Sequence, residues 1–188
     1  MPHSVGPMNI VPDTKDWTWV LERPCPDCGF DPDAISGRDV ATILRDAGPT
    51  WQVQLRRVDA RARPNSSTWS PLEYACHLRD VCRRFDNRLH LMLTQVDPEF
   101  ENWDQDATAV EDRYSEDDPT EVAAELSTAA ETLAAHFDAV RGDQWQRTGR
   151  RGDGARFTVD SFARYFLHDV LHHLHDVGAE ERKTVRGP

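Results

Sequence analysis

Two segments of the chain open with the same helix-start signal: a capping side chain, then proline, then glutamate two positions later. They are Ser70–Glu73, which reads Ser-Pro-Leu-Glu, and Asp118–Glu121, which reads Asp-Pro-Thr-Glu. Such residues satisfy the amide groups that a helix leaves unpaired at its N-terminus. Apolar residues then recur every three or four positions. This pattern predicts helices from 70 to about 95 and from 118 to about 141.

Two further segments have the same apolar period. The first covers 40–47, after which we expect Gly48-Pro49 to end the helix and a new helical segment to continue to Ala62. The last begins near Thr158 and ends before Gly178, a residue type suited to the left-handed position after a helix. Four amphipathic helices predict an all-α protein, a four-helix bundle with one long crossover.

The segments outside the helices differ in character. Residues 1–35 contain six prolines and no sustained apolar period, so we expect an irregular N-terminal arm, followed by the bundle at 36–180. Residues 97–118 include ten Asp or Glu and form the long crossover. Residues 143–157 suggest a short hairpin that turns near Asp153-Gly154.

The charge balance excludes some function classes. There are 22 Lys and Arg against 33 Asp and Glu, a net charge of −11, which disfavours nucleic acid as a partner. No window approaches the roughly 20 apolar residues of a membrane span, and the first residues do not resemble an export signal. Four cysteines do not make a disulfide scaffold. We therefore expect a cytoplasmic protein that does not contact a membrane.

Four histidines fall within eight residues of the last predicted helix, at 168–175. Two pairs have the i, i+4 spacing that lets ligands converge on one ion: His168 with His172, and Asp169 with His173. On a helical wheel the second pair lies at the edge of the apolar face, so it is favoured. The first pair is then expected to point to solvent or to a neighbouring subunit, although it stays an alternative.

A third ligand should come from a facing helix, and His77 is the best candidate because it also lies at the edge of an apolar face. Two imidazoles and one carboxylate would leave coordination positions open, as in catalytic metal sites. Asp176 could hydrogen-bond a ligand from outside. The alternative is a solvated histidine stripe, favoured by the helix dipole near the C-terminus.

These motifs resemble the DinB-like superfamily of metal-dependent bundles. Trp69–Leu78, which reads Trp-Ser-Pro-Leu-Glu-Tyr-Ala-Cys-His-Leu, resembles its Trp-x(7)-His segment. Asp169, His173 and Asp176 resemble its last-helix motif, most of all in the mycothiol-dependent maleylpyruvate isomerase branch, where the first ligand is a carboxylate. The resemblance covers roughly residues 38–178. Aspartate at 169 departs from the more usual His or Glu, and its shorter reach could weaken the site.

The resemblance implies both ligands and chemistry. His77, Asp169 and His173 would hold a divalent ion, with zinc favoured over nickel or manganese. The co-substrate would be a small thiol such as mycothiol, the other substrate an electrophile, and the protein a homodimer. The implied function is a metal-dependent thiol S-transferase or isomerase. A metal-dependent hydrolase, or a non-catalytic metal-binding or stress-associated bundle, are the alternatives.

Cys25 and Cys28 form a C-x-x-C pair in the arm, outside the core of that family. The pair could be half of a zinc site or a redox pair. A second ligand pair is needed for zinc, and Cys76 and Cys82 do not have the required spacing. The sequence therefore favours a plain turn.

Other residues could serve the site. Trp103 could line its mouth, although a role in pinning the acidic crossover is favoured. Arg150 and Arg151 could bind a substrate carboxylate or phosphate, although a solvated turn is the commoner explanation. Tyr165, one turn before Asp169, could donate a proton.

Overall fold

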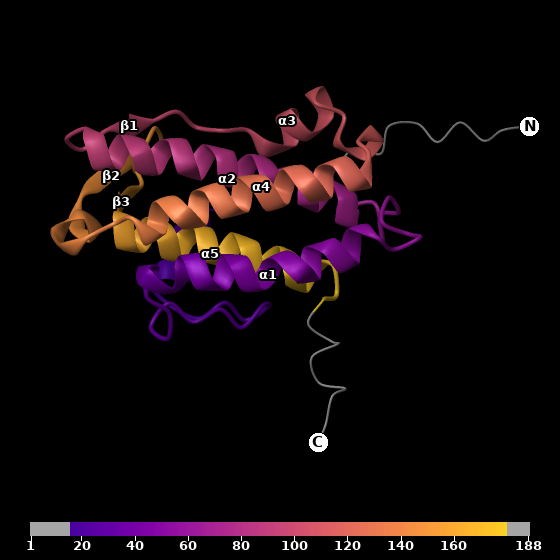
Figure 1. The fold of residues 1–188 in the computed structure, drawn as a ribbon, viewed down its shortest axis with the longest axis horizontal. Helices are drawn as coiled ribbons and strands as arrows, with labels where there is room; N and C mark the ends of the chain where they lie inside the picture. Colours follow the sequence, from indigo (N-terminus) through magenta and orange to yellow (C-terminus); the bar gives the residue numbers. More distant parts are fainter. Residues whose placement is uncertain (1–15, 180–188) are drawn as a thin grey trace, which may run out of the picture.

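Four long helices lie side by side in the computed structural model, which describes residues 16–179 (Figure 1). They are α1 (Val40–Leu55), α2 (Pro71–Thr94), α4 (Pro119–Asp138) and α5 (Val159–Asp176). Helix α4 packs against α1 and α2, and α5 packs against the same two helices. Apolar side chains from all four helices form one core. The predicted all-α four-helix bundle is confirmed.

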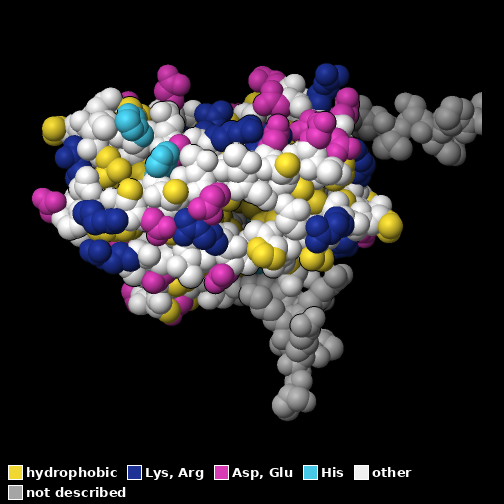
Figure 2. Space-filling view, in the orientation of Figure 1, with side chains coloured by type: hydrophobic (Ala, Val, Ile, Leu, Met, Phe, Trp, Pro, Cys, Tyr) yellow, Lys and Arg dark blue, Asp and Glu magenta, His cyan; other side chains and the backbone are white. Residues whose placement is uncertain are grey.

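A small sheet closes one end of the bundle (Figure 1). Strand β1 (Glu99–Phe100) pairs in parallel with β2 (Thr148–Arg151), which pairs antiparallel with β3 (Arg156–Thr158). The predicted hairpin is thus present, and Gly154 adopts a φ of 95° at its turn. The acidic crossover contains β1 and a short helix, α3 (Gln105–Glu111), over which acidic side chains gather (Figure 2).

The predicted break at Gly48-Pro49 is wrong. Helix α1 continues through Pro49 and ends at Leu55, short of the expected Ala62, and Val58 beyond its end is fully exposed. An internal proline costs a helix about 3 kcal/mol because it removes one hydrogen bond and crowds the preceding turn. Pro49 lies on the exposed side, however, while residues on both sides of it are buried at helical spacing. Core burial on both sides holds the helix together.

The described part of the arm docks on α5. A 3-10 turn at Trp17–Leu21 places the Trp17 ring 5.4 Å from the ring of His168, and the Gly37 amide donates to Oδ1 of Asp160 at 2.9 Å. Residues 1–15 lie outside the described residues. Among the described helices, none combines the length and the apolar composition that crossing a membrane requires.

The start of α2 is fixed by a buried carboxylate. Glu73 accepts hydrogen bonds from the Ser70 amide at 2.9 Å and from Nε of Arg63 at 2.8 Å, and its own amide donates to Oγ of Ser70 at 3.2 Å. Burial raises the pKa of Glu73, but the bonds from Arg63 and Ser70 outweigh it and leave that pKa lowered. The capping box predicted from the sequence therefore also anchors the preceding loop.

We predict that Glu73→Gln lowers the free energy of unfolding by about 3 kcal/mol, because it leaves a largely buried guanidinium without its charged partner. Glu121→Gln is the matched control, since Glu121 holds the same position in α4 but is exposed. It should cost less than about 0.5 kcal/mol in urea unfolding. Because the pKa of Glu73 is lowered on folding, its contribution is present above about pH 4 and is lost in acid. Equal losses in both variants would contradict this.

Candidate metal centre

Three side chains from two helices meet beside the core. His77 lies in the second turn of α2, and Asp169 and His173 lie one turn apart on α5. One ligand atom from each lies within 4.8 Å of the other two. The capping box of α2 and the packing of α2 against α5 bring them together. The structure therefore assembles the three residues that the sequence selected.

The geometry leaves room for a cation between these atoms. Nε2 of His77 lies 3.6 Å from Oδ2 of Asp169, and Nε2 of His173 lies 3.3 Å from Oδ1. Ligand bonds of about 2.1 Å in tetrahedral geometry place two ligand atoms about 3.4 Å apart. Both Nε2 atoms are buried and make no hydrogen bond within the described chain. Because buried polar atoms are normally paired, these orphaned nitrogens fit a divalent metal ligand set.

Neighbouring side chains hold both imidazoles in place. The His77 ring stacks on Trp103, with centroids 5.3 Å apart and planes 6° apart, and Trp69 packs on it at 5.4 Å. Nδ1 of His173 lies 3.0 Å from a carboxylate oxygen of Asp176, the outer partner that the sequence indicated. Such a contact fixes the ring and leaves Nε2 for a metal. Trp103 thus packs on the site as well as fixing the crossover, where its indole N–H donates to Thr108.

The three groups differ in their protonation. Burial lowers the pKa of His77, so this imidazole is neutral at pH 7. Burial also acts to lower the pKa of His173, but Asp169 and Asp176 outweigh it and raise that pKa above its usual range. Burial acts to raise the pKa of Asp169, yet the two imidazoles hold it well below its usual range. Without a cation, His173 therefore carries a proton at neutral pH.

Arginines lie against two aromatic neighbours of the centre, Trp103 and Tyr165. The Asp169 side chain is 33% exposed. The guanidinium of Arg84 lies 4.4 Å from the Trp103 ring centroid, and Nη1 of Arg151 donates to the Tyr165 hydroxyl at 3.2 Å. Burial and the charges of Arg84 and Arg151 lower the pKa of Arg88. Arg84 and Arg88 carry no motif that marks them in the sequence, although both follow His77 at helical spacing.

Arg150 and Arg151, both considered as substrate-binding residues, have different partners in the structure. Arg151 bonds Tyr165, one turn before Asp169, as well as Asp153. Arg150 instead forms ion pairs with Asp97 at 3.1 Å and Glu99 at 3.1 Å. Only Arg151 is therefore oriented toward the α5 residues of the candidate centre.

The expectation that His168 and His172 face solvent or another subunit is wrong. His168 is 4% exposed, and both rings pack against Trp17 of the arm. Ligand atoms of these two histidines and of Cys25 and Cys28 lie within 4.8 Å of one another. The helical wheel could not detect this, because the residues that cover this face of α5 come from the arm.

Asp169→Asn removes the only charged ligand of the centre. Loss of an outer partner typically costs 10–100-fold in metal affinity, so loss of a direct carboxylate should cost more than about 100-fold. Titration of the metal-free protein with Zn²⁺ in competition with a chromophoric chelator measures this. Asp138→Asn, on the exposed face of α4, is the control and should bind as the parent does. An Asp169→Asn protein that binds as many zinc ions as the parent, each with unchanged affinity, would exclude the centre.

The raised pKa of His173 predicts proton release on metal binding, because a ligand imidazole must be neutral. Affinity should rise with pH through neutrality. In Cys25→Ser/Cys28→Ser protein, which lacks the thiols of the other cluster, about one proton should leave per ion bound at pH 7. Isothermal titration in buffers of different ionisation enthalpy measures this number. Binding heats that are independent of the buffer would contradict the assigned protonation.

Comparisons with known proteins agree with this architecture. No curated protein sequence matches the chain. Among solved structures, YfiT from Bacillus subtilis, described as a probable metal-dependent hydrolase with an unusual four-helix bundle topology, superposes with a TM-score of 0.68. It is 18% identical, over 78% of this chain and 87% of its own. The family model of the DinB superfamily matches residues 54–177, which include His77, Asp169 and His173. The chain belongs to the DinB superfamily.

Proposed function

We propose that the protein is a metal-dependent enzyme that transfers a low-molecular-weight thiol, such as mycothiol, to an electrophile or isomerises the electrophile through such a thiol. His77, Asp169 and His173 would hold the divalent ion, with zinc the favoured metal. The observation that supports this most is the ligand set itself. Two of its three protein ligands are buried imidazole nitrogens, and the third is the partly exposed carboxylate of Asp169. Such a set leaves a position for a small molecule.

A divalent ion at an open position supplies charge that lowers the pKa of a thiol or water and orients it. The residues of the chain would hold the ion and keep its ligands in position. His77 is neutral and fixed between Trp69 and Trp103, so it offers Nε2 without reorganisation. The carboxylate of Asp176 fixes the ring of His173 through its contact with Nδ1.

The nucleophile is expected to come from outside the chain. Cys76 and Cys82 are buried in the core, and burial raises the pKa of both thiols far above neutrality. A thiol attacks as the thiolate, so neither can serve at pH 7. Cys25 and Cys28 lie with the other histidine pair. This favours a thiol co-substrate, although an activated water would satisfy the same argument.

The cations beside the centre favour an anionic electrophile. Arg84, Arg88 and Arg151 lie close enough to influence one another, in a chain whose net charge is −11. Guanidinium groups bind carboxylates through two parallel hydrogen bonds. Tyr165 retains its proton because burial and Asp169 raise its pKa. Its hydroxyl can therefore donate a hydrogen bond to a substrate held by Arg151.

The direct test is a thiol-conjugation assay on the metal-loaded protein. Mycothiol is supplied with either maleylpyruvate, an anionic electrophile, or monochlorobimane, a neutral one, and each reaction is run with and without EDTA. We expect turnover that EDTA and His77→Ala abolish, and a preference for the anionic electrophile. Metal-dependent ester or amide hydrolysis without thiol turnover would instead indicate a hydrolase, as YfiT is described. Bound metal without either activity would indicate a binding protein.

Arg151→Gln should raise KM for the anionic electrophile by about 10-fold or more, the usual cost of losing a charged hydrogen bond. It should leave metal content unchanged and affect the neutral electrophile little. Arg150→Gln is the matched control, because its ion pairs lie with Asp97 and Glu99. Steady-state kinetics on both electrophiles measures the difference. Equal effects of the two substitutions would contradict an anion site at Arg151.

A further inference from the structure

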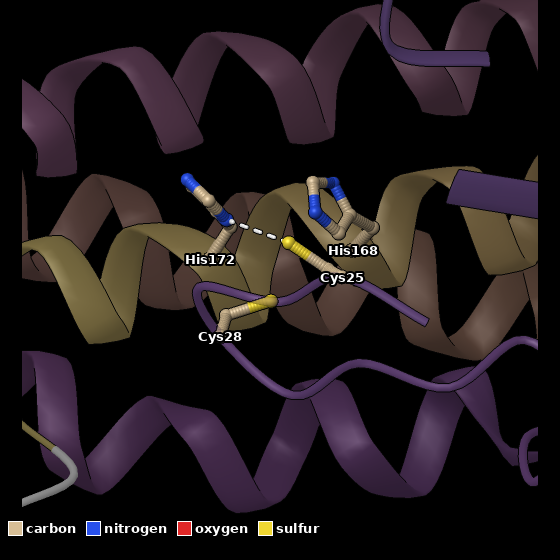
Figure 3. A group of neighbouring side chains, drawn as sticks. All are labelled: Cys25, Cys28, His168 and His172. Atoms are coloured by element: carbon tan, nitrogen blue, oxygen red, sulfur yellow. Dashed lines mark hydrogen bonds between the residues drawn. The ribbon is translucent and has the colours of Figure 1, made fainter. Parts of the chain in front are cut away.

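A second cluster of metal-binding side chains joins the arm to α5. Cys25 and Cys28 come from the arm, and His168 and His172 come from adjacent turns of α5 (Figure 3). One ligand atom from each lies within 4.8 Å of the other three. In the sequence the two pairs are separated by about 140 residues, so only the fold reveals them as one group.

The distances suit one tetrahedral ion. Sγ of Cys25 lies 3.7 Å from Nδ1 of His172. With Zn–S bonds of about 2.3 Å and Zn–N bonds of about 2.0 Å, a sulfur and a nitrogen ligand lie about 3.6 Å apart in a tetrahedron. Nε2 of His168 is buried and makes no hydrogen bond within the described chain. The cluster thus contains a buried imidazole nitrogen, on His168, that a metal ion would satisfy.

Backbone hydrogen bonds close the loop that carries the two cysteines into a turn. The Cys25 amide donates to the Phe30 carbonyl at 2.8 Å, and the Gly29 amide donates to the Cys25 carbonyl at 2.9 Å. Gly29 has a φ of 73°, a left-handed conformation that costs glycine little. This closed turn matches the C-x-x-C spacing of structural zinc sites.

Aromatic rings cover part of the cluster, in which Cys25 and His168 are buried and Cys28 and His172 are half-buried. Trp17 packs on both histidines, at 5.4 and 5.2 Å, and Phe30 packs edge-on against His168 at 5.4 Å. Cys25 is 1% exposed. A buried ion requires compensating charge, and two thiolates balance a divalent cation when both imidazoles are neutral. Four protein ligands leave no vacant position, which distinguishes this cluster from the centre at His77.

We propose that Cys25, Cys28, His168 and His172 bind a structural zinc ion that fastens the N-terminal arm to α5. Tetrahedral S₂N₂ coordination favours zinc among divalent ions. The ion would hold α5 on a face about 100° around the helix axis from the face that carries Asp169 and His173. Since His172 and His173 are neighbours in sequence, it would also fix the rotation of α5 that directs Asp169 and His173 toward His77.

Cobalt substitution tests this proposal directly. The reduced, metal-free full-length protein is titrated with Co²⁺, and the absorption spectrum is recorded. Thiolate ligands give a charge-transfer band in the near ultraviolet, and tetrahedral Co²⁺ gives intense visible bands. The centre at His77 has no sulfur, so it cannot produce the first signal. We expect the band to saturate at one Co²⁺ per chain and to disappear on addition of one equivalent of Zn²⁺ beyond any taken up by the other centre.

Variants separate the two sites. Cys25→Ser/Cys28→Ser should lose the thiolate band and one bound metal equivalent, whereas His77→Ala should keep the band. Cys76→Ser is the matched control, because that buried thiol lies in the core and contacts Asp117. It should keep both signals.

Absence of the thiolate band in the reduced parent protein would overturn the proposal. So would equal metal content in the parent and the double-cysteine variant. The parent spectrum requires no substitution, so the test holds even if the double variant does not fold. The test is also independent of catalysis. If the protein shows the thiolate band but no thiol turnover, the structural zinc site stands and only the proposed reaction is wrong.

Discussion

The rotation of α5 about its own axis decides which side chains can meet. Consecutive residues on a helix point about 100° apart, so His168 and Asp169 cannot serve the same ligand group. In the structure Asp169 points toward His77 on α2, and His168 points toward the arm cysteines. A small rotation would separate both groups at once. The arm, α1 and α2 all contact α5 and resist such a rotation.

The two clusters differ in charge and in exposure, and these differences suit different tasks. A divalent ion held by one carboxylate and two neutral imidazoles would keep one positive charge beside an exposed edge, where it could attract an anionic ligand. With two thiolates, the ion and its ligands would be neutral together, beside the rings of Trp17 and Phe30. Without an ion, Nε2 of His168 is buried with no hydrogen bond within the described chain, at a cost of about 1–3 kcal/mol, whereas Nε2 of His173 keeps the Asp169 carboxylate at 3.3 Å. The first arrangement favours chemistry, and the second favours stability.

Much of this could be predicted from the sequence because the signals are local. The capping residues of α2 and α4 fix helix starts, and the i, i+4 spacing of Asp169 and His173 is a property of one helix. His77 required a further step, since its position at the edge of an apolar face had to be matched to a facing helix.

What could not be predicted depends on segments that are remote in sequence. Pro49 was expected to end a helix because propensity is local, whereas burial on both sides of it is tertiary. His168 was expected to be solvated because nothing in α5 shows that the arm covers it. The histidines beside the cysteine pair are also hidden from local analysis, because about 140 residues separate the two pairs. The Pro49 and His168 errors both arose where tertiary contacts outweigh local pattern.

The central claim is that His77, Asp169 and His173 bind one divalent cation. Anomalous diffraction from crystals of the zinc-reconstituted protein, recorded on both sides of the zinc absorption edge, tests it most directly. We expect an anomalous peak within bonding distance of Nε2 of both histidines and an oxygen of Asp169. No peak there, with the three side chains bonded instead to water or to one another, would contradict it.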